Sequence, residues 1–209
     1  MLKLEGQRIY LRDHQPEDLE VFYAWRSDPR VTRYLSGRTA MLTDAFSQLA
    51  DALRETDQVP RTKYFLALGL KENQRLIGEA GLTLAEWAEN TGRAEDGDRS
   101  EDGGRAANTG RAENTGPADL GYFLLPSYWG QGYATEAAQV LIAYAFTVLK
   151  LHKITAGCDA ANGASEQVIK KCGLEREAYF KKHVRLNGAW RDRLEYGLLY
   201  ADWAKRQAR

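Results

Sequence analysis

The chain has 209 residues, of which 44% are hydrophobic and 28% are charged, and this composition predicts one globular domain over residues 1–209 with a substantial core. Its 29 basic residues equal its 29 acidic residues, which excludes the strongly basic surface of a nucleic-acid-binding protein. The sequence shows no signal peptide and no apolar run of membrane-spanning length, so we expect a cytoplasmic protein without a membrane partner.

Hydrophobic periodicity in the first 84 residues predicts three strands and two helices. Polar and apolar residues alternate in the first strand, whereas the helices repeat apolar residues at intervals of three and four. Pro16 opens one helix, and Thr43 is the expected N-cap of the other. In chain order we expect a strand at 9–12, helices at 16–27 and 43–55, and the strands of a hairpin at 63–70 and 75–84.

Residues 90–119 divide into five hexads, NTGRAE, DGDRSE, DGGRAA, NTGRAE and NTGPAD. A left-handed β-helix of hexapeptides needs an aliphatic residue in each repeat, and these hexads offer none larger than alanine. Their low complexity predicts a mobile, solvated insertion between the third and fourth strands. The alternative is a binding role for the regularly spaced arginines Arg93, Arg99, Arg105 and Arg111.

The second half of the chain alternates strands with helices. The run from Ala134 to Leu149 is apolar on nearly all sides but too short for a bilayer, which predicts a helix buried against a sheet. Asn187 and Gly188 are a strong hairpin signal. Strands are expected at 119–125, 153–160, 176–186 and 191–200, and a second helix at 162–173. The complete order predicts a mixed α/β domain around one sheet.

The cysteines and histidines receive structural interpretations. Cys158 and Cys172 lack the spacing of metal ligands, so we expect reduced, packed thiols and no bound metal. His14, His152 and His183 lie at a strand end, at a helix end and among basic residues. A solvated structural role fits each of them at least as well as a catalytic one.

The stretch YWGQGYATEAA, residues 128–138, places two glycines directly before the long helix. Such a turn gathers free N–H groups at the positive end of the helix dipole, which favours an anion such as phosphate. The alternative is a tight turn without a ligand. A Walker A loop is excluded because Tyr133 and Ala134 follow Gly132, and a dinucleotide fingerprint is excluded because Thr135 occupies the place of its third glycine.

The run LGYFLLPSYWGQGYATEA resembles the central motif of the GCN5-related N-acetyltransferases (GNAT), and especially the RimJ/RimL-like branch that acetylates ribosomal-protein N-termini. The pyrophosphate loop of this family reads Gln/Arg-x-x-Gly-x-Gly/Ala. Gly132 and Ala134 match it, and Trp129 replaces its first residue. NGASEQVIKKCGL resembles a further segment, Asn-x-x-Ser, of the same family. The resemblance covers nearly the whole chain and implies the GNAT fold, a mixed and mostly antiparallel sheet flanked by helices.

Acetyl-coenzyme A is the co-substrate that this resemblance implies, because the loop amides of the family hold the pyrophosphate of coenzyme A. Carried over by position, the pyrophosphate donors are Gln131, Gly132, Tyr133, Ala134 and Thr135. The pantetheine arm is expected to form backbone hydrogen bonds along Phe123, Leu124 and Leu125, with Asn162 reaching the arm from its other side.

Acetyl transfer requires a neutral amine, a donor to the developing oxyanion and help for the departing thiolate. The N–H of Leu125 is the expected oxyanion donor. Ile169 stands where many family members carry a tyrosine acid, and resemblance to the N-terminal-acetylating branch favours Ser165 instead; a helix cap is the alternative for Ser165. Glu79 is the candidate base, against the alternative of a surface or core-edge carboxylate.

The sequence therefore favours acetyl transfer from acetyl-coenzyme A to a primary amine, a protein N-terminus or a small amine, by direct attack in a ternary complex. Two alternatives are a coenzyme-A-binding module with little or no catalysis and a nucleotide-binding protein. Trp25 and Tyr34 are expected to border the substrate cleft, with a core position as the alternative. A homodimer is compatible with the resemblance, and no nucleic acid, membrane or metal partner is expected.

Overall fold

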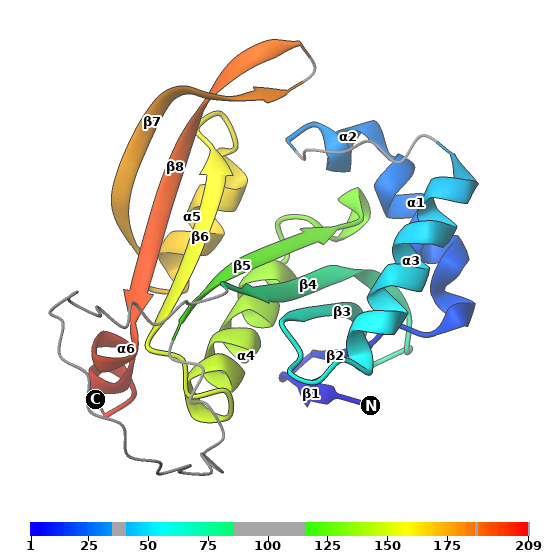
Figure 1. Cartoon of the computed structure of the whole chain (residues 1–209), viewed down its shortest axis with the longest axis horizontal. Coiled ribbons are helices and arrows are strands. Elements are labelled where there is room, and N and C mark those ends of the chain that lie inside the picture. Colours follow the sequence, from blue (N-terminus) through cyan, green and yellow to red (C-terminus); the bar gives the residue numbers. More distant parts are fainter. Residues whose placement is uncertain (35–40, 86–115, 187, 209) are drawn as a thin grey trace, which may run out of the picture.

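The computed structural model of the chain describes residues 1–34, 41–85, 116–186 and 188–208. These residues form an eight-stranded sheet with the strand order β1-β2-β3-β4-β5-β6-β8-β7 (Figure 1). The strands are β1 (Lys3–Glu5), β2 (Ile9–Asp13), β3 (Lys63–Leu70), β4 (Leu76–Leu84), β5 (Pro117–Leu124), β6 (Lys153–Asp159), β7 (Glu175–Leu186) and β8 (Ala189–Leu199). The helices are α1 (Leu19–Ser27), α2 (Pro29–Thr32), α3 (Leu42–Thr56), α4 (Tyr133–Thr147), α5 (Gly163–Lys171) and α6 (Tyr200–Gln207), with 3₁₀ turns η1 (Pro16–Asp18) and η2 (Pro126–Tyr128).

The pairing directions confirm the predicted fold class. Every neighbouring pair of strands is antiparallel except β5 and β6, which run parallel. Helices lie against the sheet, with α4 crossing behind its centre and α1 to α3 gathered at one end in Figure 1. The sheet is therefore mixed, mostly antiparallel and flanked by helices.

The first half of the chain departs from the prediction at its smallest elements. β1 was not predicted, because three residues are too few to show a periodic pattern. The helix expected at 16–27 is a 3₁₀ turn followed by α1. α2 is a short extra helix that starts after Asp28, whose side chain accepts a hydrogen bond from the N–H of Arg30 at 2.8 Å. α3 starts one residue after Met41, so Thr43 lies inside that helix and is not its N-cap.

The hexad segment has a different C-terminal boundary from the predicted one. Residues 90–115, with Arg93, Arg99, Arg105 and Arg111, lie outside the described part of the chain. The last hexad ends inside β5, which begins at Pro117, two residues before the expected strand. Proline is tolerated at the first position of a strand, and its carbonyl accepts the N–H of Ala85 at 2.9 Å. The segment between the paired strands β4 and β5 therefore ends at Gly116 and not at Asp119.

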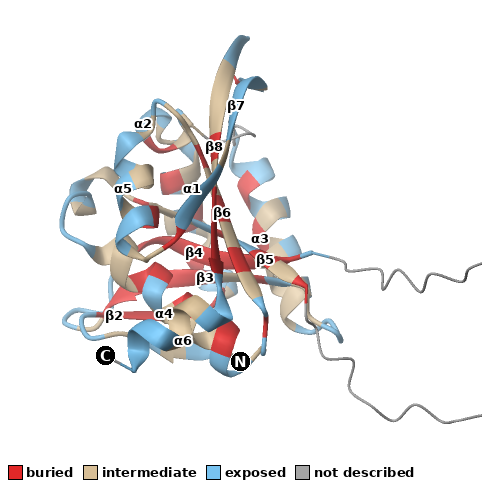
Figure 2. Ribbon diagram, turned by 90° about the vertical axis from the view of Figure 1, so that its left-hand side faces the viewer, coloured by how far each residue is buried: buried red, intermediate tan, exposed pale blue. Residues whose placement is uncertain are grey.

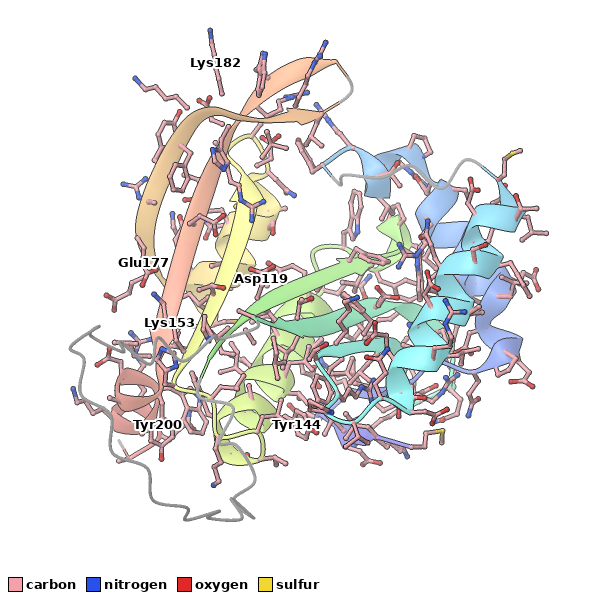
Figure 3. All side chains as sticks on the ribbon, in the orientation of Figure 1. Asp119, Tyr144, Lys153, Glu177, Lys182 and Tyr200 are labelled. Carbon is pink, nitrogen blue, oxygen red and sulfur yellow. The ribbon has the colours of Figure 1, made fainter. Side chains whose placement is uncertain are left out.

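The C-terminal half follows the prediction except at its last element. Strands β7 and β8 pair antiparallel up to Leu186 and Ala189, which is the expected hairpin, although Asn187 itself is outside the described residues. Lys153 reaches over β8 to Glu177 on β7, with 2.8 Å between Nζ and Oε1 (Figure 3). Helix α6 was not predicted, because its eight residues carry no buried side chain and form no apolar stripe longer than two turns.

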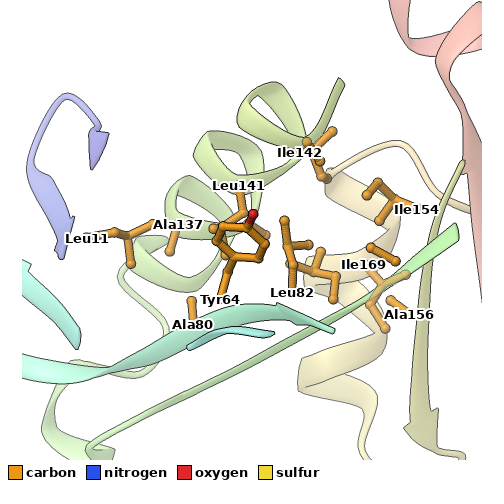
Figure 4. Close-up of a cluster of buried hydrophobic side chains, with 14 of the residues drawn as sticks. Leu11, Tyr64, Ala80, Leu82, Ala137, Leu141, Ile142, Ile154, Ala156 and Ile169 are labelled. Atoms are coloured by element: carbon orange, nitrogen blue, oxygen red, sulfur yellow. The ribbon is translucent and has the colours of Figure 1, made fainter. Parts of the chain in front are cut away.

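The main core lies between the sheet and α4 (Figure 4). Helix α4 is apolar on nearly all sides, as expected, and its buried residues include Leu141 and Ile142, which belong to one buried cluster with Leu11 and Leu82 of the sheet. Figure 2 shows that buried residues concentrate in the middle strands of the sheet and on the face of α4 toward them. This cluster fixes the direction of α4, and with it the position of the glycine loop at its N-terminus.

A smaller core covers the opposite face of the sheet. It joins Phe22 and Trp25 of α1 to Leu49 of α3, and Phe123 of β5 packs against it. Leu124, the next residue along β5, belongs instead to the main core. Because neighbouring residues of a strand point to opposite faces, α4 and the α1–α3 group must lie on opposite sides of β5.

Strands β5 and β6 separate after a short parallel contact. Their register runs from Pro117 opposite Lys153 to Asp119 opposite Thr155, while β5 continues to Leu124 and β6 to Asp159. The two strands diverge beyond this contact in Figure 1. The sheet thus has an opening between its two central strands, where the facing edges of β5 and β6 pair with no strand among the described residues.

Candidate active site

The glycine loop adopts the backbone that its sequence requires. Gly130 and Gly132 have φ values of 74° and 84°, a left-handed conformation that glycine adopts without steric cost. Gly132 is the N-cap of α4, and it has no side chain to accept from the first N–H groups of the helix. Those amides have no partner within the helix either. The predicted pyrophosphate donors Gln131, Gly132, Tyr133, Ala134 and Thr135 therefore converge at a positively polarised helix end.

The loop is tied to the end of β5. The indole Nε1 of Trp129 donates to the carbonyl of Leu124 at 2.8 Å, and Nε2 of Gln131 donates to the carbonyl of Ser127 at 2.9 Å. Trp129, which replaces the usual first residue of the family loop, thus connects the loop to the strand that borders the opening. This contact holds the anion site and the gap between β5 and β6 in one arrangement.

The backbone of β5 changes one predicted role. The N–H of Leu125 donates to the carbonyl of Ile77 at 2.8 Å, so it faces β4 and is not available to an oxyanion. Backbone groups of an antiparallel strand alternate between its two sides. Phe123 therefore also faces β4, whereas the N–H groups of Tyr122 and Leu124 point toward the opening. Of the three residues predicted to pair with the pantetheine arm, only Leu124 presents its backbone there.

Asn162 is the N-cap of α5. Its Oδ1 accepts from the N–H of Ser165 at 3.2 Å, which leaves its side-chain amide NH₂ as the group that can donate to another partner. The capping role that was the alternative for Ser165 therefore belongs to Asn162. Ser165 contributes only its N–H to that cap.

The hydroxyl of Ser165 contacts the hydroxyl of Tyr122 and does not cap a backbone N–H among the described residues. Oη of Tyr122 lies 3.1 Å from Oγ of Ser165 and donates at 3.0 Å to the carbonyl of the same residue. Burial raises the pKa of Tyr122, so its hydroxyl stays protonated at neutral pH. Ile169, which stands where many family members carry a tyrosine acid, is buried in the main core. A phenol from β5 therefore stands beside α5, and nothing in the linear sequence pointed to that pairing.

Glu79 lies inside a buried cluster of charges and not at the surface. Its Oε2 is 2.9 Å from Nε2 of His14, and its Oε1 is 3.3 Å from Nη2 of Arg26. Glu79 is 3% exposed and His14 is also 3% exposed. The interpretation of His14 as a solvated residue was therefore wrong: the chain turns inward after β2 and places the imidazole against Phe22 and Trp25.

Two carboxylates surround His14 and set its protonation. Nδ1 of His14 lies 3.6 Å from Oδ2 of Asp18, too far for a hydrogen bond but within range of a charge pair. Burial alone would lower the pKa of His14, but Asp18 and Glu79 outweigh that effect and the pKa is raised. Arg12 completes the cluster through two hydrogen bonds of 2.7 Å to Asp18. Despite burial, these donors hold the pKa of Asp18 well below its usual range.

The two aromatic residues expected at the cleft differ in position. Trp25 is fully buried in the smaller core, which is the alternative that the sequence left open. Tyr34 donates from its hydroxyl to the carbonyl of Ala161 at 3.3 Å, and so reaches from the end of α2 to the segment between β6 and α5. It borders a cavity of about 50 Å³ with Asp159 and Arg191. Tyr34 is therefore the residue of this pair that reaches the far side of the opening.

Both cysteines are free, and burial raises the pKa of Cys158 to about 11 and that of Cys172 to about 12. The prediction of reduced, packed thiols is confirmed. Across the described ranges no group of three His, Cys, Asp or Glu side chains could hold a metal ion. Within the same ranges no helix is long and apolar enough to cross a membrane.

The chain matches the acetyltransferase (GNAT) domain family over residues 8–175. It belongs to this family. Over 207 residues it is 27% identical to the uncharacterized N-acetyltransferase p20 of Bacillus licheniformis, which is 98% of this chain and 99% of that protein. It is 31% identical over 84 residues to the [ribosomal protein uS5]-alanine N-acetyltransferase of Escherichia coli (strain K12), which is 40% of this chain and 43% of that enzyme.

Two relatives from Bacillus subtilis (strain 168), the uncharacterized N-acetyltransferase YnaD and the probable N-acetyltransferase YjcK, are 39% and 40% identical over 85 residues, and the chain covers about half of their length. Among solved structures, RimL, a ribosomal L7/L12 α-N-protein acetyltransferase in complex with coenzyme A, has a TM-score of 0.74 at 14% identity, covering 96% of this chain and 99% of that one. The GNAT family and fold predicted from the sequence are confirmed, and so is the N-acetyltransferase class at the level of the family. The match to the uS5-alanine enzyme supports the predicted resemblance to the RimJ/RimL-like branch over 84 residues.

Proposed function

We propose that the chain transfers an acetyl group from acetyl-coenzyme A to a primary amine, at a protein N-terminus or in a small molecule, by direct attack in a ternary complex. The observation that carries this proposal is the left-handed glycine loop at the N-terminus of α4, beside the opening between β5 and β6. Its relatives are named N-acetyltransferases, and RimL, which shares the fold, binds coenzyme A.

Three groups of residues fit the parts of coenzyme A. The amides from Gln131 to Thr135 suit the pyrophosphate, and the absence of a Cβ at Gly132 lets an anion approach the backbone. The N–H of Leu124 faces the opening and suits the pantetheine arm or the thioester carbonyl oxygen. Asn162 offers its amide NH₂ from α5. Once bound, acetyl-coenzyme A supplies the thioester carbonyl that the amine attacks.

In this proposal Ser165 acts on the departing thiolate and Glu79 acts on the attacking amine. Ser165, held by Tyr122, donates a hydrogen bond to the thiolate as the C–S bond breaks, and Glu79, on the opposite face of β5, receives the proton of the attacking amine as the C–N bond forms. Ser165→Ala should lower kcat about tenfold or more, the size expected for loss of a hydrogen bond to a charged group, and leave the KM for acetyl-coenzyme A unchanged. A variant with the kcat of the wild type would remove Ser165 from the reaction.

A thermal-shift series and a thiol-release assay test the function. Coenzyme A should raise the Tm more than ATP or NAD does, and at least one amine in a panel of N-terminal peptides, polyamines and aminoglycosides should release thiol from acetyl-coenzyme A. Stabilisation without turnover on any amine supports the non-catalytic module, and larger shifts with ATP or NAD support a nucleotide-binding protein.

The variant Gly132→Glu tests whether the glycine loop binds the pyrophosphate of coenzyme A. The variant brings bulk and negative charge to the loop and should abolish the shift with coenzyme A while the domain stays folded. Gly130→Ala is the control, because Gly130 shares the left-handed backbone and a Cβ there would meet no atom within 4 Å. Normal binding of coenzyme A by Gly132→Glu would show that the loop is not the pyrophosphate site.

A further inference from the structure

A guanidinium from the N-terminal turn lies over the glycine loop. Arg8, between β1 and β2, is separated from the loop by more than 120 residues, yet its Nη1 donates to the carbonyl of Gln131 at 3.0 Å. Its Nη2 is the atom nearest to Gly132: a Cβ added there would stand 3.3 Å from it. The ring centroid of Tyr133 lies 4.6 Å from Cζ of Arg8. The side chain is 47% exposed and so accessible to a ligand.

The position of Arg8 is fixed by Glu136. Nε of Arg8 donates to one carboxylate oxygen of Glu136 at 2.8 Å, and the backbone N–H of Arg8 donates to the other at 2.7 Å. Gly6 allows this contact, because a Cβ on it would lie only 2.7 Å from Oε1 of Glu136. Burial alone would raise the pKa of Glu136, but donation by Arg8 outweighs it and lowers the pKa. The turn after β1 is therefore docked on the first turn of α4.

Glu136 would oppose an anion at this helix end if it stood alone. It is an ionised carboxylate in the first turn of α4, next to the amides that would receive the pyrophosphate. Arg8 cancels this charge through Nε and keeps the Nη2 edge of its planar fork toward the loop. A guanidinium held at two of its nitrogens and stacked on a ring loses little further freedom when it binds phosphate, which it recognises by paired N–H donors.

We infer that Arg8 is part of the coenzyme A site and donates to the pyrophosphate from outside the glycine loop. This inference rests on the proposed function, which supplies the ligand. It also gives β1 a role, since that short strand holds the turn that carries Arg8. The site would then combine the backbone amides of the glycine loop with one guanidinium from the N-terminal part of the chain.

Calorimetry with coenzyme A on four proteins tests this contact. Relative to the wild type, Arg8→Gln should raise the Kd for coenzyme A about tenfold or more, the size expected for a charged hydrogen bond. Glu136→Gln should bind coenzyme A as tightly as the wild type or more tightly. The comparison of Arg8→Gln/Glu136→Gln with Glu136→Gln isolates the direct contact, because neither protein carries the opposing carboxylate. Equal Kd values for these two proteins would overturn the inference.

S-acetylpantetheine separates binding of phosphate from support of the fold, because this thioester lacks the pyrophosphate. Arg8→Gln should lower kcat/KM for acetyl-coenzyme A about tenfold and leave kcat/KM for S-acetylpantetheine unchanged. An equal loss with both thioesters would assign Arg8 a purely structural role and overturn the inference. Arg54→Gln is the control, since Arg54 is an exposed arginine of α3 paired with Asp51. Failure of the wild type to bind coenzyme A would instead refute the proposed function, and the inference with it.

Discussion

Glu79 is a carboxylate whose two oxygens already have cationic partners. His14 holds one oxygen and Arg26 holds the other, so an incoming amine must share or displace a hydrogen bond to reach it. This arrangement suits a carboxylate that orients an amine as well as one that takes its proton. Kinetics against pH can distinguish the two roles, because only a base that takes the proton of the amine shapes the pH dependence of the rate.

Glu79→Gln should therefore reduce kcat/KM by about 10² or more and change the shape of its pH profile if Glu79 is the base. The measurement is the rate of thiol release from acetyl-coenzyme A at saturating and limiting amine between pH 6 and 9. Glu55→Gln is a matched control, because Glu55 of α3 also pairs with a cation, Lys63 of β3, at 3.1 Å, and neither strand β5 nor strand β6 contributes to this pair. An unchanged pH profile for Glu79→Gln would remove Glu79 from proton transfer.

His14 makes the stability of the fold depend on pH. Its folded-state pKa is raised, so the protonated imidazole stabilises the native state fully below about pH 6.5, the unfolded value. This contribution is lost as the pH rises through the raised folded pKa. We expect the free energy of unfolding to fall across that window in urea titrations of the wild type.

His14→Gln should flatten this dependence, because the amide can still donate to Glu79 but does not titrate. Cys158 and Cys172 add a decline of their own only from about pH 9 upwards, where the unfolded thiols ionise while burial holds the folded pKa values at about 11 and about 12. Stability that increases over the same window would contradict the assignment of a charged His14.

At the scale of elements, the sequence predicted the helices and strands with a long periodic pattern and missed the short ones. Helix α4 and strands β3 and β4 were located within two residues, because each has a run of apolar residues long enough to show its period. β1 and α6 carry three and eight residues, and each is held by contacts that the local sequence does not contain. Trp203 of α6, for example, packs on Phe146 of α4 with 5.3 Å between the ring centroids.

The candidate site likewise contains segments that the sequence predicted and partner residues that it did not. The glycine loop and the Asn162 to Ser165 segment are continuous in the sequence, so their pattern was sufficient to find them. The partners of the candidate site residues are distant in the sequence: Tyr122 contacts Ser165, His14 contacts Glu79, and Arg8 contacts Gln131. A single sequence contains no signal for such pairs, because periodicity reports only neighbours within an element.

Helix α1 is held on the sheet largely by Trp25, which provides a test of packing. Its ring centroid lies 5.4 Å from that of Phe123, and its Nε1 is buried with no hydrogen-bond partner among the described residues. Trp25→Ala should cost about 3–5 kcal/mol of stability, as large-to-small changes in a core do. Trp25→Phe should cost much less, because it removes an unsatisfied donor along with part of the ring. Urea denaturation measures both, and an equal loss in the two variants would contradict this account.

At the scale of the molecule, the opening between β5 and β6 connects two different surfaces. Ser165 and Tyr122 lie with α4 and α5 on one side of the sheet, and Glu79 lies with α1 on the other. A thioester entering from the first side and an amine entering from the second would meet at the edge of β5. In the proposed reaction, reactants that approach from opposite faces would allow direct transfer without a covalent enzyme intermediate.

The ends of the hexad segment provide the last test of the whole fold. Leu84 and Ala118 are paired in the register of β4 and β5, and the N–H of Ala85 donates to the carbonyl of Pro117 at 2.9 Å. The strands could therefore be joined by a short hairpin. Replacing residues 86–115 by Asn-Gly would leave a three-residue loop with Gly116, a common hairpin length.

This deletion should preserve the fold and raise the free energy of unfolding by about 2 kcal/mol, because closing a shorter loop costs less chain entropy. Denaturant titration measures this change, and the thermal shift with coenzyme A should remain that of the full chain. The deletion also tests the alternative role of the hexad arginines. If they bind the acceptor, the KM for the amine rises in the deletion variant while the KM for acetyl-coenzyme A stays constant. If they do not, both constants match the full chain, since every residue assigned here to the reaction lies outside the deleted segment.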